Sequence, residues 1–181
     1  MSYSKLIVAV LCLASAHSAA AAISRDNIEN NTVAPLGEDS ASAPRVVVYS
    51  VGPLNIAAGA VVDIRFQSEV TTQCSGNIGV GRYVVRASSA TATTGTNVVP
   101  PAVENVTEDV HHQILVHTGL EQPSSALTGV YYNAVVYALS ASSQGCYTES
   151  ISVPPEDTDS DKLLIEGAGT NSFGELIVEV R

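Results

Sequence analysis

Three histidines, His111, His112 and His117, stand close together in the chain, and imidazole is the commonest metal ligand in proteins. The segment around them reads as a β-strand, in which consecutive side chains point to opposite faces. His111 and His112 are then on opposite faces, and His111 and His117 lie about 20 Å apart, too far for one ion to bridge. We therefore predict no histidine metal site, and we expect His117 on the solvent side, opposite Ile114 and Val116.

Three aspartates, Asp157, Asp159 and Asp161, alternate along an acidic stretch, which is the spacing of oxygen ligands in calcium loops. The EF-hand pattern is not completed, because Lys162 replaces the turn glycine and Ala168 replaces the bidentate glutamate. The alternative interpretation is a solvated acidic surface loop. We predict no cofactor, and calcium at these aspartates is the one ion that the sequence leaves open.

Catalytic motifs are missing from the sequence. There is no Gly-x-Ser-x-Gly nucleophile elbow, and the Gly-x-Gly at residues 79–81 precedes a predicted strand, with no helix N-terminus to hold a phosphate. We predict that the protein is not an enzyme. Catalytic triads and carboxylate pairs are defined by geometry and not by sequence order, so a hydrolase of unknown substrate remains the third hypothesis.

The segment of residues 130–139 carries the candidate ligand site. Its alternation places Tyr131, Asn133 and Tyr137 on one face and the small and apolar residues on the other, inward face. Two tyrosines and an amide on a flat face can stack on a sugar ring and bond its hydroxyl groups. The alternative is a central strand whose tyrosines cover neighbouring side chains.

Residues 1–22 have the three parts of a secretory signal: Lys5, an apolar stretch over residues 6–16, and a small-residue cleavage site that ends at Ala22. A membrane anchor is the alternative, but the apolar stretch is shorter than the roughly 20 residues that span a bilayer. We predict an exported protein that is secreted, at the cell surface or in the periplasm, with no membrane span. Asn30 and Asn105 begin glycosylation sequons, at about the frequency expected by chance.

Removal of the signal takes Cys12 with it and leaves Cys74 and Cys146. An even pair in an oxidising compartment is most simply one disulfide. The bond closes a loop of about 72 residues and stabilises the fold by about 4 kcal/mol in the chain-entropy description. A redox pair and two free thiols are the alternatives, and the distance between the cysteines in the sequence disfavours the former.

The charge balance limits the partners. The chain has 18 Asp+Glu against 8 Lys+Arg, a formal net charge of −10, and only 5% aromatic residues. Such an acidic chain repels phosphate backbones, so we predict no nucleic-acid partner.

The remaining chain predicts an all-β fold. Residues 23–44 are polar and lack apolar periodicity, so we interpret them as a flexible acidic leader. From residue 45 to residue 181 the chain consists of short β-rich runs bounded by turn residues, with no helical repeat. We therefore predict a single antiparallel β-sandwich, or jelly-roll-like, domain with one disulfide. The runs that we expect to be strands are 45–51, 60–67, 82–87, 113–117, 130–139, 162–165 and 175–180.

Two functions fit these predictions. The first is an exported, non-enzymatic binding module that attaches to a glycan or to an extracellular protein. The alternative is a structural subunit of a homo-oligomer, such as a trimer of jelly rolls, or of a fibre. Its expected contact is the apolar C-terminal strand of residues 175–180, because such a strand must be paired or covered.

Overall fold

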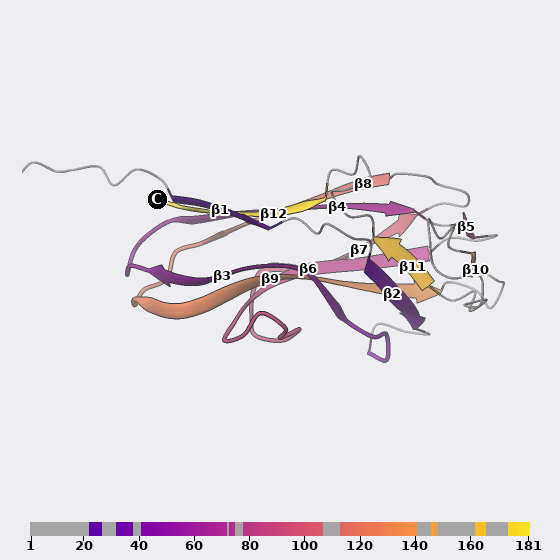
Figure 1. The fold of residues 1–181 in the computed structure, drawn as a ribbon, viewed down its shortest axis with the longest axis horizontal. Coiled ribbons are helices and arrows are strands. Elements are labelled where there is room, and N and C mark those ends of the chain that lie inside the picture. The colour runs from indigo at the N-terminus through magenta and orange to yellow at the C-terminus, as the bar shows by residue number, and fades with distance from the viewer. Residues whose placement is uncertain are drawn as a thin grey trace, which may run out of the picture.

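The computed structural model describes residues 22–26, 32–37, 41–71, 73–74, 78–106, 113–140, 146–147, 162–165 and 174–181. Every regular element in these ranges is a β-strand, and the strands form two layers (Figure 1). Sheet A pairs, in spatial order, β1 (Ala22–Asp26), β12 (Glu175–Val180), β4 (Val62–Thr71) and β8 (Gln113–Glu121). Sheet B pairs, in spatial order, β3 (Val46–Ile56), β9 (Leu127–Ser140), β6 (Ile78–Ala87) and β7 (Thr96–Val106).

Two short strands join the layers at one end of the molecule. The strand β11 (Lys162–Ile165) pairs antiparallel with both β4 and β2 (Thr32–Gly37), and β2 runs parallel to β9. Beyond them, β5 (Gln73–Cys74) and β10 (Cys146–Tyr147) form a separate antiparallel pair. The other described pairings are all antiparallel. The predicted all-β, antiparallel sandwich is therefore confirmed.

The main core lies between the two sheets and follows the alternation of the strands. On β4, Val62, Ile64 and Phe66 are buried, whereas Asp63 and Arg65 point outward, as the sequence predicted. Sheet B contributes the inward face of β9, which the sequence also predicted correctly. Its buried residues there are Tyr132, Ala134, Val136 and Ala138.

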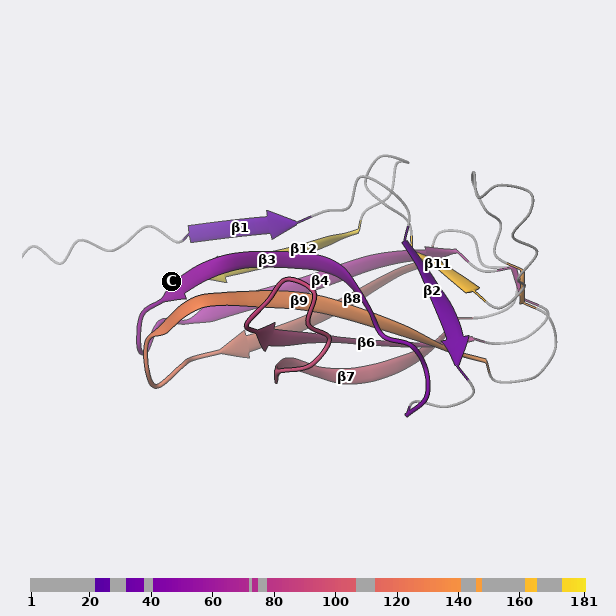
Figure 2. The ribbon, with the colours of Figure 1, turned by 60° about the horizontal axis from the view of Figure 1, so that its bottom comes forward.

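A second, smaller core covers the outer face of sheet B. The loop of residues 88–95 and the segment of residues 41–47 lie across this face (Figure 2). Beneath them, Tyr83, Val85, Val135 and Tyr137 are buried together with two alanines. The strands β6 and β9 are therefore buried on both faces.

The structure differs from the sequence prediction at the start of the chain. The segment interpreted as a leader without regular structure contains β1 and β2. The strand β1 pairs with β12 over five registered positions, from Ala22 opposite Val180 to Asp26 opposite Leu176. Because β12 then lies between β1 and β4, the C-terminal strand is paired within the sheet.

The strand β7 was not predicted at all. Pro100 and Pro101 interrupt its sequence, and proline cannot donate a ladder hydrogen bond. It is tolerated here because, among the described strands, β7 lies at the edge of sheet B and pairs only with β6.

No helix in the described residues has the length and apolar character needed to cross a membrane.

Candidate functional site

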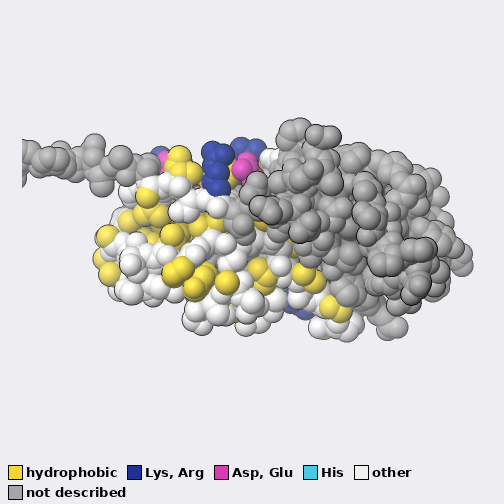
Figure 3. Space-filling model, viewed as in Figure 1, with side chains coloured by type: hydrophobic (Ala, Val, Ile, Leu, Met, Phe, Trp, Pro, Cys, Tyr) yellow, Lys and Arg dark blue, Asp and Glu magenta, His cyan; other side chains and the backbone are white. Residues whose placement is uncertain are grey.

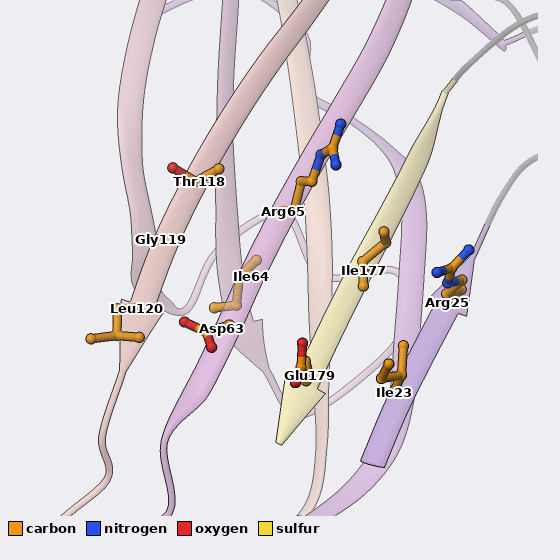
Figure 4. Close-up of a pocket in the computed structure, with 10 residues that line it drawn as sticks. All are labelled: Ile23, Arg25, Asp63, Ile64, Arg65, Thr118, Gly119, Leu120, Ile177 and Glu179. Carbon is orange, nitrogen blue, oxygen red and sulfur yellow. The ribbon is translucent and has the colours of Figure 1, made fainter. Parts of the chain in front are cut away.

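A groove of about 600 Å³ lies on the outer face of sheet A (Figure 4). Each of the four strands contributes outward-facing side chains to this groove. The register aligns them in two rows that run across the strands. The acidic row is Ile23, Glu179, Asp63 and Leu120, and the basic row is Arg25, Ile177, Arg65 and Thr118.

Charge on this face is balanced by ion pairs. Arg181 pairs with Asp63, and its Nε lies 3.6 Å from Glu179 Oε1. Arg25 Nη1 lies 3.8 Å from Glu175 Oε2, across the β1–β12 ladder. In the view of Figure 3, basic and acidic side chains stand next to each other over β1 and β12, with apolar side chains beside them.

The predicted sugar-stacking surface on β9 is not an exposed face, and that expectation is wrong. Tyr131, Asn133 and Tyr137 do share one side of the strand, but Asn133 is fully buried and Tyr137 is only 4% exposed. Only Tyr131 is partly exposed, and it packs close to Gly52 of β3. The physical reason is the covering loop of residues 88–95, which closes over the side of β9 that we expected to be open.

Asn133 fixes that loop in place. Its Nδ2 donates to the carbonyl oxygens of Ser89 at 2.9 Å and Ala92 at 2.8 Å, and its Oδ1 accepts from Ser50 Oγ at 2.7 Å. A buried amide with these partners is satisfied and costs little to desolvate. Asn133 therefore acts as a structural anchor between β9, β3 and the loop.

Tyr137 lies on Gly81, its direct partner on β6. A Cβ at Gly81 would fall 1.9 Å from the Tyr137 ring, so only glycine leaves room for the ring. The Arg45 guanidinium carbon lies 5.0 Å from the centre of the same ring, a cation–π contact. The Tyr83 ring centre is 6.3 Å from that of Tyr137, and Tyr83 Oη donates to Thr93 O at 2.8 Å.

Two hollows flank this aromatic cluster, and we call them together the sheet B trough. The smaller, of about 260 Å³, is lined by Tyr83, Tyr137, Thr94 and Asn97 among others. The larger, of about 420 Å³, lies over β3 between residues 45–50 and the loop. Arg45 and Thr93 line both hollows.

His117 is on the opposite side of its strand from the one we expected. On β8, Leu115 is buried and Val116 is half exposed, so His117 faces inward with Leu115. Its Nε2 lies 3.0 Å from Pro100 O on β7. The contact places His117 between the two sheets at their edge, where its partner is backbone.

Several predicted sites fall outside the described residues. These are His111 and His112, the aspartates of residues 157–161, and the signal of residues 1–22 apart from Ala22. The described part of the chain holds no cluster of three or more potential metal ligands. The backbone pairing of β5 with β10 places Cys74 directly opposite Cys146.

The sequence analysis did not identify a group of hydrogen-bonded polar side chains that connects the two sheets, which we call the polar clasp. Glu121, at the end of β8, accepts a hydrogen bond from Tyr132 Oη and another from Arg86 Nε, both at 2.8 Å. Burial, and then the bond to Glu121, raise the pKa of Tyr132 well above its ordinary value. Because Arg86 and Tyr132 belong to sheet B and Glu121 to sheet A, the three residues tie the layers together. No local motif indicates the clasp.

Arg82 is a second buried charge that the sequence did not reveal. It is 2% exposed on β6, and its Nη2 lies 2.7 Å from Glu104 Oε2 of β7. Burial lowers the pKa of Arg82 from its ordinary value, and the nearby Glu104 partly offsets this effect. Glu104 is half exposed, so the ion pair joins a buried cation on β6 to a carboxylate at the surface, at the edge of sheet B.

The chain matches no family model and no curated protein by sequence. Among solved structures it is similar to chains of infectious bursal disease virus. The Gx strain structure is 9% identical and covers 89% of this chain and 32% of that chain, with a TM-score of 0.47. The VP2 subviral particle is 10% identical and covers 88% and 32%, also with a TM-score of 0.47. The chain thus spans about a third of the length of these viral chains, and a likeness this distant supports no argument about function.

Proposed function

We propose that the protein is an exported, non-catalytic β-sandwich subunit that associates with copies of itself through the outer face of sheet A. One observation carries the proposal. Among the described residues, four large hydrophobic side chains are exposed, and three of them, Ile23, Val116 and Leu120, lie on this face at 56%, 49% and 65% exposure. Exposed apolar residues that gather on one surface mark a contact with a partner.

Charge identifies a second copy of the chain as the partner. The whole chain has a formal charge of −10, so two copies repel each other over most of their surfaces. The outer face of sheet A is an exception, because Arg25, Arg65 and Arg181 stand among three carboxylates there. Two such faces approach with the smallest electrostatic cost.

The two rows also make the face complementary to itself. A two-fold axis that runs across the strands, between the rows, sets the acidic row of one subunit on the basic row of the other. Asp63 then meets the partner subunit's Arg65, and the same contact repeats by symmetry. A two-fold axis along the strands would instead place acidic rows on each other. The Arg181 ion pairs are exposed enough to rearrange at small cost.

The sequence analysis placed the contact between subunits on the C-terminal strand alone. We now propose that the contact is the whole outer face of sheet A. The strand β12 has no open edge, since β1 and β4 pair with it on both sides. Its outward residues Ile177 and Glu179 still line the groove, so β12 takes part by its face.

Export and the disulfide belong to the same proposal. The predicted signal ends where β1 begins, and Cys74 and Cys146 are registered opposite each other, as a cross-strand disulfide requires. An oxidising compartment would keep this bond closed.

Recognition of a glycan or of an extracellular protein is the second candidate function. The three-residue surface on β9 does not favour it, because most of that surface is buried. The observation that does favour it is that the exposed polar residues Thr94 and Asn97 line the smaller hollow of the sheet B trough.

Light scattering during size exclusion tests self-association. The chain from Ile23 to Arg181 is compared with Leu120→Asp, and Val103→Asp is the matched control. Val103 is also half exposed, but it lies on β7 of sheet B. We expect the wild type and Val103→Asp to elute as oligomers and Leu120→Asp as a folded monomer. A wild type that stays monomeric at high concentration, or a Val103→Asp variant that dissociates equally, contradicts the proposal.

A further inference from the structure

The strand β1 lies at the edge of sheet A, and its attachment depends on backbone pairing. Among the described strands it is hydrogen-bonded to β12 alone, over five registered positions, and it lies beside β3 of the other sheet (Figure 2). The described ion pair between β1 and β12 joins Arg25 Nη1 to Glu175 Oε2 at 3.8 Å, and the Arg25 side chain is 63% exposed. An ion pair this exposed adds little to the stability of the pairing.

The side chains of β1 add little to the core. Ile23 and Arg25 are exposed, and Ser24 is half-buried. Ser24 lies opposite the buried Val178, so the inward position of β1 holds a small polar residue. Among the described residues, neither hydrophobic core includes a residue of β1. Because buried apolar surface is the dominant favourable contribution to folding, the core stays assembled when β1 leaves the sheet.

The strand β12 is held in place without β1. Its inward residues Leu176 and Val178 are fully buried, and it pairs with β4 over six registered positions. When β1 leaves, β12 therefore keeps its place and presents an edge of free backbone N–H and C=O groups. An apolar edge strand of this kind is a template on which another strand can pair.

The strand that fits this edge is β1 of a second copy. The edge already accepts the β1 sequence, with Ser24 opposite Val178 and Arg25 close to Glu175. The β1 segment of a second copy brings the same backbone and the same side chains, so every contact is formed again in the same register. Exchange of an identical element between two subunits therefore costs little.

From these observations we propose that β1 is an exchangeable strand, which leaves β12 of its own subunit and pairs with β12 of a second copy. Pairing within one chain has an effective concentration on the order of millimolar, so exchange needs a comparable protein concentration or a second contact between the copies. In the exchanged pair, Ile23 and Arg25 of one copy occupy the same places on the outer face of the other. The inference goes beyond the proposed face-to-face association, and either can fail without the other.

Cysteine cross-linking between two copies tests the exchange. Ser24→Cys is placed in one mature chain and Val178→Cys in another, which is labelled with ¹⁵N. These positions are registered opposite each other, at a Cα separation that a disulfide can bridge. Both point inward, away from the outer face of sheet A, so contact between outer faces does not bring them together.

Both chains also carry Leu120→Asp, which removes the association through the outer face and keeps the two proposals distinguishable. They are mixed at about millimolar concentration and oxidised, and mass mapping of the unreduced peptides identifies the residues that are joined.

We expect a disulfide between position 24 of one chain and position 178 of the other. The matched control replaces Ser24→Cys by Asp26→Cys, which lies two residues out of register with Val178. Its yield should be lower by roughly tenfold or more, because two residues add about 7 Å along the strand, beyond the reach of a disulfide. A single chain that carries both Ser24→Cys and Val178→Cys should close the bond within itself at low concentration.

A second pair covers the case in which Val178→Cys does not fold. Arg25→Cys and Ile177→Cys are also registered opposite each other, on the more exposed side of the two strands. Ile23→Cys is the out-of-register control for this pair.

Three outcomes overturn the inference. The first is a bond that forms within the doubly substituted chain but not between chains at millimolar concentration. The second is an equal yield from the registered and the out-of-register mixtures, which indicates random collision. The third is the absence of the bond even within the doubly substituted, folded chain, which shows that β1 does not pair with β12 in this register.

Discussion

Cys74 lies directly opposite Cys146 in the antiparallel pairing of β5 with β10. Opposite positions in an antiparallel pair have Cα atoms about 4.5–5.5 Å apart, which lies within the Cα separation of a disulfide. We expect the mature protein to show no free thiol. It should be about 2 Da lighter than its reduced form, because each cysteine loses one hydrogen when the bond forms. Reduction should lower the stability by roughly 2–4 kcal/mol.

The matched control is the Cys74→Ser, Cys146→Ser double variant, which should resemble the reduced wild type in denaturant midpoint. Reductant should then have no further effect on it. Labelling of two thiols in the unreduced, denatured wild type would rule the disulfide out.

Asn133 supports a second prediction, because one side chain holds the loop of residues 88–95 to the sheet. Asn133→Ala removes two hydrogen bonds to loop carbonyls and leaves a space in the interior. We expect a loss of roughly 2–3 kcal/mol of stability and much faster amide exchange in the loop. Asn55→Ala is the control, since exposed Asn55 accepts one bond, from Gly129 N, and should cost less than about 1 kcal/mol.

Gly81 and Tyr137 should be coupled energetically. Gly81→Ala places a Cβ within the space of the Tyr137 ring, so we expect a loss of about 1–3 kcal/mol from overpacking. Tyr137→Leu removes the ring, and in that background Gly81→Ala should cost markedly less. A double-mutant cycle by urea unfolding measures the coupling, and additive effects would show that the ring does not restrict position 81.

The stability of the fold should decrease at alkaline pH because of buried tyrosines. Burial and the bond to Glu121 raise the pKa of Tyr132 in the folded state, and burial raises that of Tyr83 although Arg45 opposes it. Above about pH 10 the unfolded chain releases these protons while the folded chain retains them. The stabilisation is therefore complete below pH 10 and declines as the pH rises.

Urea midpoints between about pH 8 and pH 11 measure this decline. Tyr132→Phe should flatten it and Tyr83→Phe should flatten it less, because the shift at Tyr132 is the larger of the two. An identical alkaline slope in wild type and Tyr132→Phe would contradict the assignment to Tyr132.

The parts of the fold that the sequence predicted are those with unambiguous alternation. The strand of residues 175–180 was predicted with its true bounds, and β4 with its correct faces over residues 62–67. Apolar residues alternate there with charged or polar ones, apart from Ile177 on the outward side. On β8, by contrast, Ile114, Leu115 and Val116 are consecutive apolar residues. Either face could be the inner one, so the assignment of His117 depended on a shift of one residue.

The site was harder to predict because its walls come from distant segments. The alternation of β9 indicated that Tyr131, Asn133 and Tyr137 share a side, and this is correct. Whether that side is open depends on the loop of residues 88–95, which is about 40 residues away in the chain, and on the ability of Asn133 to hold it. A pattern within one strand contains no information about such a cover.

The proposed two-fold arrangement makes the last prediction, a charge swap on the outer face of sheet A. Arg65→Glu places a carboxylate against the partner subunit's Asp63, so we expect dissociation into folded monomers. Adding Asp63→Arg exchanges the two charges and should restore the oligomer, because each new pair is again opposite in sign. Both variants are made in an Arg181→Gln background, so that the ion pair of Arg181 with Asp63 does not affect the comparison.

Arg25→Glu in the same background is the control. Arg25 meets the partner subunit's Ile23 in this arrangement, so its reversal should weaken association far less than Arg65→Glu does. Sedimentation velocity at low and high salt measures each variant, and the effect of Arg65→Glu should diminish as salt screens the repulsion. Failure of the double exchange to restore association, together with dissociation by Leu120→Asp, would retain the face as the contact and reject the axis across the strands.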